Sequence, residues 1–390
     1  MPSMNFALSE QQLAIEDGVK KVCAGFDDDY WTKCEEERRF PVEFHRAMAN
    51  GGWLGITMPE DLGGTGLGVT DAAIMMQCVA AGGGGQSAAS ALHINLFGPH
   101  SIVVHGTPEQ KRRFLTPLIK GEEKACFGVT EPDAGLDTTS ITTFATKVPD
   151  GYRISGRKMW TSTGQVADKI LLLTRTAPKD TARPTDGMTL FYAPLDRTKI
   201  EVRRIHKMGR NAVDSNAVFI DDYFVADEDR IGEEGKGFAY ILHSLNPERV
   251  LVAAEAIGLG RDALRRAANY ARERIVFGRP IGQNQGVQHP LAECWAQLEA
   301  AWWQTLRASW LYDQGLSCGA EANAAKYLAA QAAFNTTTRA VLTHGGMGYA
   351  REYQVERLFR ESMVARIAPV SEQLILSFIA EKVLDLPKSY

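Results

Sequence analysis

One carboxylate, Glu248, could either accept a proton or begin a helix. Glu248 lies in the stretch Asn246-Pro247-Glu248-Arg249, and a desolvated glutamate can serve as a general base. The same residue types also start helices, because an asparagine caps, a proline opens the first turn and an acidic residue favours the helix dipole. The residues alone favour the helix start over the general base. Glu255, seven residues later and on nearly the same helix face, is a second candidate base.

Two further segments, residues 127–137 and 158–164, combine hydroxyl groups with aromatic rings. The first contains Thr130, and the second contains Trp160 and Ser162. Such hydroxyls are the hydrogen-bond partners that a buried heteroaromatic ring needs. The alternative for Trp160 is an aromatic side chain in the core of a β-domain.

Two glycine-rich stretches are weak candidates for nucleotide-binding loops. The run at residues 82–85 is not followed by the Lys-Ser or Lys-Thr that a phosphate loop needs, so we interpret it as a mobile junction between helices. The stretch at residues 345–348 lacks the preceding strand of a dinucleotide-binding fold. Its spacing alone indicates the C-terminal cap of a helix.

The period of the apolar residues changes twice along the chain, which indicates three regions. Ser9, with Gln12 three residues later, predicts the start of an amphipathic helix, and further helical segments follow to about Gly121. Between Ala125 and Ile231, short β-branched runs alternate with turn residues, which predicts a small antiparallel β-domain. After Gly235, long apolar stretches predict bundle helices at residues 250–274, 291–312, 322–344 and 372–384. We expect domains at residues 1–123, 124–233 and 234–390.

Composition narrows the classes of function. The 390 residues, 45% of them hydrophobic, are enough for two or three packed domains. A formal net charge of -4 gives no general attraction for nucleic acid or for an anionic membrane. With no basic leader and no apolar run of about 18 residues, we expect a cytoplasmic protein. The six cysteines never approach Cys-x-x-Cys spacing, so we expect buried thiols and no metal site.

Three blocks, in this order, resemble the acyl-CoA dehydrogenase family. Residues 127–137 and 158–164 resemble the flavin-contacting strands of that family, and Gly345 to Arg360 resembles its C-terminal signature. The order helical, β, helical matches the family over essentially the whole chain. The resemblance implies an α+β, mainly α fold with an N-terminal helical domain, a middle antiparallel β-domain that contacts flavin and substrate, and a C-terminal four-helix bundle.

The resemblance implies FAD as the cofactor and assigns its contacts residue by residue. The main chain of Val129 and the hydroxyl of Thr130 would bond the polar edge of the flavin ring, which Phe127 would also line. Trp160 would cover one face of the ring, and Ser162 would donate a hydrogen bond to flavin N5. Arg274 would pair with the pyrophosphate through its forked donors, although a helix-terminal arginine taken alone is usually solvated. The other implied contacts, several of them made across a subunit interface, are Phe277, Gln285, Gly345, Gly346, Ser371 and Gln373.

The chain departs from the family pattern at Leu342, Leu136 and Pro369. Leucine at 342 and at 136 removes an amide contact to the cofactor and a serine contact to substrate and flavin, and Leu136 is kept as an apolar substrate contact. Pro369 occupies the position where many members carry the catalytic glutamate of a Tyr-Glu-Gly-Thr segment, and it also lacks the N–H that would polarise the thioester carbonyl. The isovaleryl-CoA and long-chain types instead draw the base from a C-terminal helix.

Glu248 matches that alternative base position, so the resemblance favours Glu248 over a capping role. Asn246 and Arg249 match positions that contact the substrate. The implied reaction is the FAD-dependent α,β-dehydrogenation of an acyl-CoA thioester to the trans-2-enoyl-CoA. The implied assembly is a homotetramer, a dimer of dimers, which passes electrons to an electron-transfer flavoprotein. A flavin monooxygenase, which need not contain Glu248, and a non-catalytic flavoprotein on the same fold are the alternatives.

Overall fold

The computed structural model describes residues 7–389, which form two compact units. The sheet unit comprises residues 34–67 and 90–248, and the helical unit comprises residues 7–33, 68–89 and 249–389. Helix α8 (Gly237–Glu273) contributes to both units, since Glu248 is the last residue of the sheet unit and Arg249 opens a stretch of the helical unit. Each unit is therefore assembled from separated stretches of sequence.

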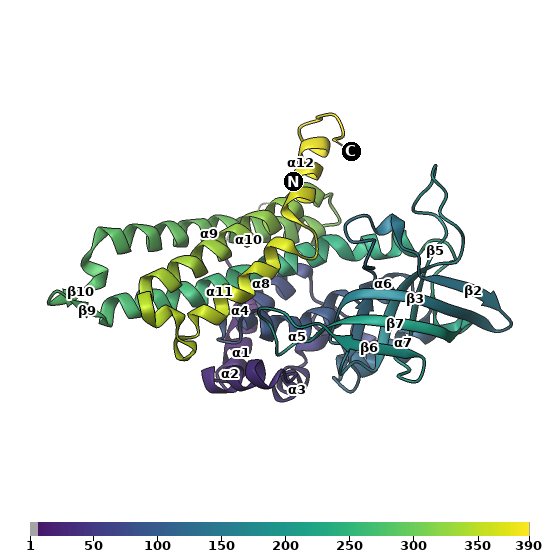
Figure 1. The fold of residues 1–390 in the computed structure, drawn as a ribbon, viewed down its shortest axis with the longest axis horizontal. Coiled ribbons are helices and arrows are strands. Elements are labelled where there is room, and N and C mark those ends of the chain that lie inside the picture. Colours follow the sequence, from purple (N-terminus) through teal and green to yellow (C-terminus); the bar gives the residue numbers. More distant parts are fainter. Residues whose placement is uncertain (1–6, 390) are drawn as a thin grey trace. The chain divides into compact units, whose positions relative to one another are not determined.

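An eight-stranded sheet forms the centre of the sheet unit. Its strands are β1 (Ala125–Gly128), β2 (Phe144–Val148), β3 (Gly151–Ser162), β4 (Lys169–Arg175), β5 (Met188–Pro194), β6 (Ile200–Arg204), β7 (Ser215–Ala226) and β8 (Arg230–Ile231). They lie in the order β6-β7-β3-β2-β4-β5-β8, and β1 pairs with β4. Figure 1 labels β2, β3, β5, β6 and β7 of this sheet. Most neighbours are antiparallel, as predicted, whereas β1 and β2 pair with β4 in parallel. The chain enters β1 from a helix, α7 (Pro108–Ile119), so no tight hairpin sets the direction of β1.

Alternate residues of the central strands face two different cores. On β4, Leu171 and Leu173 belong to a cluster that also contains Phe114 of α7, whereas Ile170 and Leu172 belong to a second cluster. Side chains of a strand alternate between its two faces, so the middle of β4, residues 170–173, is continuously apolar because both of its faces are covered. Two other helices of this unit are α3 (Val42–Asn50) and α6 (His100–His105).

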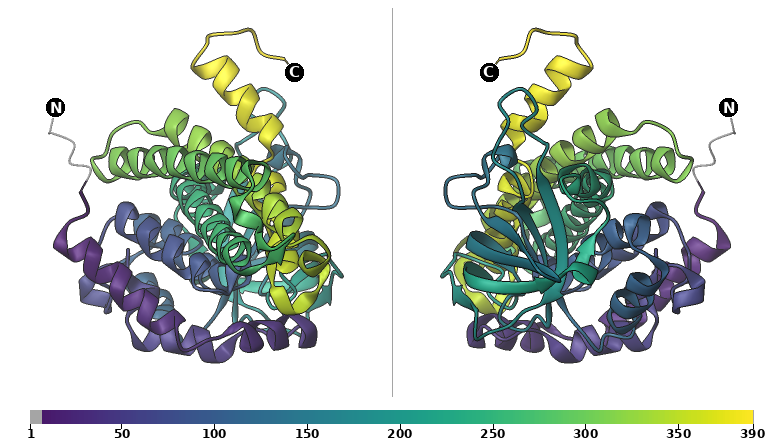
Figure 2. Two further views of the ribbon diagram at one scale, coloured as in Figure 1. Left: turned by 90° about the vertical axis from the view of Figure 1, so that its left-hand side faces the viewer. Right: turned by 90° about the vertical axis from the view of Figure 1, so that its right-hand side faces the viewer.

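Long helices form the helical unit. They are α1 (Glu10–Cys23), α4 (Val69–Ala81), α9 (Gln285–Asp313), α10 (Gly319–His344), α11 (Val355–Ile367) and α12 (Glu372–Lys382), while α2 (Asp28–Glu37) and α5 (Gly85–Phe97) are shared between the units. Helices α9 and α10 lie side by side, and α11 packs against α10 (Figure 2). A two-stranded ribbon of β9 (Ile275–Val276) and β10 (Arg279–Pro280) joins α8 to α9. The predicted bundle helices are confirmed.

Two local predictions can be compared with the structure directly. Ser9 caps α1 through a capping box, in which its hydroxyl accepts from the Gln12 N–H and the Gln12 side chain accepts from the Ser9 N–H. The run at residues 82–85 does join two helices, α4 and α5, but it is closely packed. A Cβ on Gly84 would lie 2.5 Å from the Trp31 ring, so no space is left there for a phosphate.

One stretch of the described residues, Val355–Lys382, is long and apolar enough by composition to cross a membrane. It contains two helices, α11 and α12, separated at residues 368–371. A spanning helix needs about 20 consecutive residues, so neither helix alone has that length.

Candidate active site

The two segments singled out in the sequence meet in the sheet unit. The Met159 N–H donates a hydrogen bond to the Thr130 carbonyl at 2.8 Å, and the Lys158 Nζ donates to the Val129 carbonyl at 3.1 Å. The Thr130 hydroxyl makes no hydrogen bond to any described residue, so it is available to a ligand. The backbone of residues 129–130 and that of residues 158–159 therefore form one continuous surface.

A buried ion pair locks this junction. The Lys158 Nζ lies 2.8 Å from the Glu131 Oε1, and the two side chains are 0% and 4% exposed. Thr142 and Thr143 donate further hydrogen bonds to the Glu131 carboxylate. Burial alone would raise the pKa of Glu131, but the charge and the hydrogen bond of Lys158, with the threonine donors, hold this pKa at about 2. The pair fixes the two segments rather than offering a group for proton transfer.

Trp160 stands on a break in the sheet. The register between β3 and β7 shifts between Lys158 and Thr161, and Trp160 has a φ of 61° and a side chain that is 59% exposed. A left-handed backbone is costly for a bulky residue and persists where the surroundings impose it. Bulges of this kind re-aim side chains. The alternative of a β-core aromatic is wrong, and a large ring is instead presented at the surface of the sheet unit.

Ser162, at the end of β3, is held from a neighbouring loop. The Arg210 Nη2 donates to the Ser162 Oγ at 3.2 Å and to the Ser215 Oγ at 3.0 Å, and the Arg210 Nη1 donates to the Ser90 Oγ at 3.0 Å. Because the Ser162 oxygen accepts from Arg210, its own hydrogen is free to point at a ligand. Leu136 is 56% exposed, which makes it accessible to an apolar ligand.

Glu248 lies inside a helix, not at its start. Helix α8 begins at Gly237, so Asn246 does not cap it and Pro247 is an interior proline. The capping interpretation of this stretch is therefore wrong. An interior proline removes one backbone hydrogen bond and costs about 3 kcal/mol. Local sequence preference alone would therefore not place Pro247 inside a helix. The Glu248 side chain is 7% exposed.

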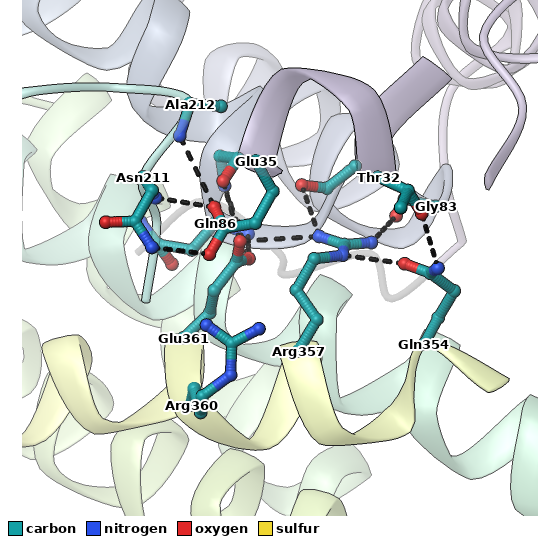
Figure 3. A network of polar contacts seen from close by, with 12 residues as sticks. Thr32, Glu35, Gly83, Gln86, Asn211, Ala212, Gln354, Arg357, Arg360 and Glu361 are labelled. Atoms are coloured by element: carbon teal, nitrogen blue, oxygen red, sulfur yellow. Dashed lines mark hydrogen bonds and ion pairs between the residues drawn. The ribbon is translucent and has the colours of Figure 1, made fainter. Parts of the chain in front are cut away.

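Glu255, the reserve candidate, is engaged in a buried network of the helical unit. The Gln86 Nε2 donates to the Glu255 Oε2 at 2.6 Å, and Glu255 is 1% exposed. Next to it, the Glu361 carboxylate accepts from the Gln86 N–H at the start of α5 and contacts the Arg357 guanidinium at 3.3 Å (Figure 3). An anion is stabilised at a helix N-terminus, and here the chain supplies its own carboxylate. Arg357, a residue of the C-terminal block, therefore has a structural role in this network.

The predicted contacts of the helical unit are exposed. Phe277 is 101% exposed, and Arg274, Gln285, Gly346 and Gln373 are also exposed. Gly345 caps α10 as predicted, with a φ of 62° that glycine adopts without strain. A Cβ at Gly345 or Gly346 would meet no atom within 4 Å. The packing of the described residues therefore does not require glycine at position 346.

Pro369 and Ser371 lie between α11 and α12. Pro369 is exposed, and the Val370 carbonyl accepts from the buried Lys326 Nζ at 2.6 Å. The Ser371 hydroxyl caps α12 by accepting from the Leu374 N–H at 3.3 Å. Ser371 therefore has a structural role as well as its predicted contact to the cofactor.

The residues present in the sheet unit fit a flavin. A heteroaromatic ring needs a hydrophobic cover and hydrogen-bond partners along one edge, and Trp160, Thr130 and Ser162 offer both from adjoining segments. Among residues 7–389, no group of His, Cys, Asp and Glu could hold a metal ion. All six cysteines are buried, as predicted, and none of them forms a disulfide.

Sequence reasoning missed Arg210, Glu131 and Lys158. The last two lie in the two singled-out segments and have opposite charges, and charges are rarely buried unless they are paired. Arg210 carried no such signal, since its partners Ser90 and Ser162 come from distant segments.

Family models match the chain along nearly its whole length. They are "Acyl-CoA dehydrogenase, N-terminal domain" at residues 9–122, "Acyl-CoA dehydrogenase, middle domain" at residues 126–223 and "Acyl-CoA dehydrogenase, C-terminal domain" at residues 235–384. A similar protein is the acyl-CoA dehydrogenase fadE12 of Mycobacterium bovis, 33% identical over 404 aligned positions that cover 100% of both chains.

Solved structures are similar over the same extent. The butyryl-CoA dehydrogenase of Megasphaera elsdenii superposes with a TM-score of 0.92 at 28% identity, covering 98% of this chain and 100% of that one. The FAD complex of PigA superposes with a TM-score of 0.92 at 25% identity, covering 97% and 99% of the two chains.

Proposed function

Because this chain belongs to the acyl-CoA dehydrogenase family of oxidoreductases, we propose that it catalyses the FAD-dependent α,β-dehydrogenation of an acyl-CoA thioester to the trans-2-enoyl-CoA. The observation that carries this proposal is the junction of residues 129–130 with residues 158–162. There the Thr130 hydroxyl, the Ser162 hydroxyl and the outward-facing Trp160 indole lie on adjoining backbone segments. FAD, when bound, accepts the β-hydrogen of the substrate as a hydride.

The sheet-unit residues are proposed to hold the flavin. The Thr130 hydroxyl and the Val129 main chain bond the polar edge of the ring, beside Phe127. Trp160 excludes water from one face, which strengthens every polar interaction beneath it. Ser162 donates its hydroxyl hydrogen toward N5, an orientation supported by the Arg210 contact to its oxygen. Leu136 is proposed to contact the substrate.

Glu248 is proposed to remove the α-proton of the substrate. Its position within α8, next to an interior proline, and its low exposure support a role other than helix capping. Glu255, whose carboxylate accepts a hydrogen bond from the Gln86 side chain at 2.6 Å, is kept as the reserve candidate. Asn246 and Arg249, on the same stretch of α8, are proposed to bind the CoA portion.

The helical unit is proposed to contact the cofactor of a neighbouring subunit in a homotetramer, a dimer of dimers. These contacts would come from four exposed residues, Arg274, Gln285, Gly345 and Gly346. The exposed Phe277 and Gln373 and the half-buried Ser371 are also proposed to contact the cofactor. Assembly is supported by the large apolar side chains that this unit exposes, among them Phe277, Tyr349 at 90% and Trp295 at 60%. We also propose a cytoplasmic location, an electron-transfer flavoprotein as acceptor, and domains at residues 1–123, 124–233 and 234–390.

Anaerobic titration of the purified yellow protein with a panel of acyl-CoA thioesters tests the proposal. Loss of the oxidised flavin absorbance with at least one thioester, together with formation of the enoyl-CoA, is expected. A non-catalytic flavoprotein would keep its absorbance with every thioester. A monooxygenase would also fail to bleach with acyl-CoA and would consume oxygen only with another substrate and a reductant.

A further inference from the structure

The Arg210 guanidinium lies among three serine hydroxyls of the sheet unit. It donates to Ser90, Ser162 and Ser215 at 3.0, 3.2 and 3.0 Å. Ser90 and Ser215 are 4% and 2% exposed, so two of the three contacts are shielded from water. A guanidinium remains charged at any pH at which the protein is folded, and its donors lie in one rigid plane.

The loop that carries Arg210 is fixed by a second carboxylate. The Glu35 side chain accepts from the Asn211 N–H, from the Asn211 Nδ2 at 2.7 Å and from the Ala212 N–H at 3.3 Å (Figure 3). Glu35 is 9% exposed. Arg210 itself has a φ of 57°, a conformation that a non-glycine residue keeps only when its surroundings impose it. The position of the guanidinium is therefore determined from both sides, by the serines and by the Glu35 clamp.

We propose that Arg210 is a positioning residue, which aims the Ser162 hydroxyl hydrogen at the flavin and makes reduction of the bound flavin more favourable. The inference rests on the proposed function, because it requires a flavin at Ser162. Arg210 supplies donors only, so the Ser162 oxygen must act as acceptor toward it and its hydrogen turns the other way. Reduction adds electron density to the flavin, and a fixed positive charge one hydroxyl away stabilises that state.

The competing interpretation is that Arg210 only ties three segments together. Removing a purely structural tie would lower the melting temperature without moving the flavin potential. Lys207 offers a matched control, because its Nζ donates to the Ser215 Oγ at 3.1 Å and to the Val213 carbonyl, but not to Ser162. Lys207→Met thus removes a positive charge from the same loop while Arg210 and Ser162 stay in place.

The test is the two-electron midpoint potential of the FAD-loaded protein, measured by equilibration with redox dyes in the wild type, Arg210→Met, Arg210→Lys and Lys207→Met. Arg210→Met is expected to lower the reduction equilibrium constant at least tenfold, a shift of about 30 mV. Arg210→Lys keeps the positive charge and is expected to lower the midpoint potential by less than half as much as Arg210→Met does. Lys207→Met is expected to change the equilibrium constant less than threefold, which corresponds to about 14 mV.

Two further variants keep the inference falsifiable if Arg210→Met does not hold FAD. Ser162→Ala should lower the potential, and adding Arg210→Lys to it should cause no further change, because both act through one hydroxyl. An unchanged potential in Arg210→Met, an equal fall in Lys207→Met, or additive effects of Ser162→Ala and Arg210→Lys would overturn the inference. A wild-type protein that binds no FAD, or is bleached by no acyl-CoA, would instead overturn the proposed function.

Discussion

The side-chain amide of Gln86 donates a 2.6 Å hydrogen bond to the Glu255 carboxylate, and both side chains are buried. We expect Glu255 to contribute to the packing of α5 and α8 rather than to proton transfer. Glu255→Gln should lower the free energy of unfolding by about 1–3 kcal/mol, because the buried hydrogen bond from the Gln86 side chain is weakened. The rate of flavin reduction should stay within about tenfold of the wild type. Chemical unfolding and stopped-flow absorbance measure the two effects; a stable variant that has lost its reduction rate would contradict this assignment.

Acid should weaken the Glu131–Lys158 pair in a defined range of pH. The folded pKa of Glu131 is about 2, below the ordinary value of 4.5. A carboxyl group whose pKa is lowered in the folded protein stabilises the folded state at pH values above its ordinary pKa. This stability is lost as the pH falls through about 4 toward 2. The contribution is on the order of 3 kcal/mol.

Glu131→Gln should therefore be less stable at pH 7, and its stability should fall less between pH 5 and pH 3 than that of the wild type. The midpoint of urea unfolding at these pH values measures this. Glu201→Gln, which changes a 59% exposed side chain on β6, is the control and should behave as the wild type. Equal acid sensitivity in Glu131→Gln and the wild type would exclude the assigned role of this pair.

Trp160 should matter for the cofactor more than for the fold. Its side chain is 59% exposed, so Trp160→Ala should leave the melting temperature of the FAD-free protein nearly unchanged. The Kd for FAD should rise roughly 30-fold, since the lost cover of the ring is worth about 2 kcal/mol. Phe224→Ala, at a 42% exposed aromatic of β7, is the matched control and should leave the Kd unchanged. Titration of the FAD-free protein with FAD would contradict the account if the two variants bound alike.

Removal of FAD should weaken the assembly. A cofactor that is bound only in the assembled state stabilises that state by mass action. Sedimentation velocity of the FAD-loaded protein should show a tetramer, and the FAD-free protein should dissociate at a higher concentration. A monomer with full flavin occupancy would contradict the proposed role of Arg274, Gln285, Gly345 and Gly346.

Sequence patterns predicted most elements of the fold because they are local. The cap at Ser9, the alternation of β-branched runs and the long apolar helices each depend on neighbouring residues, and each is confirmed. The helix start that the sequence indicates at Asn246 is wrong for a physical reason. Asn246 and Pro247 carry strong local signals for a helix start, but Ile241 is buried in the core of the sheet unit, and that packing extends the helix back to Gly237.

Only part of the candidate site could be predicted, because local patterns reveal single segments and not the contacts between distant ones. The two segments around Thr130 and Trp160 were visible as blocks, and the structure joins them through the Met159–Thr130 hydrogen bond. The outward turn of Trp160 depends on a register shift against β7, which is set by pairing with residues far along the chain. The hold of Arg210 on Ser162 likewise joins segments 48 residues apart, and no local pattern encodes it.

Glu248→Gln tests the central claim most directly, because it keeps the size and hydrogen bonding of the side chain and removes only the proton acceptor. The variant should bind FAD and acyl-CoA as the wild type does. In anaerobic stopped-flow mixing with the best acyl-CoA, its flavin should be reduced slower by a factor on the order of 10³ or more. Glu255→Gln is measured alongside as the control. Flavin reduction at a near wild-type rate in Glu248→Gln would contradict the account.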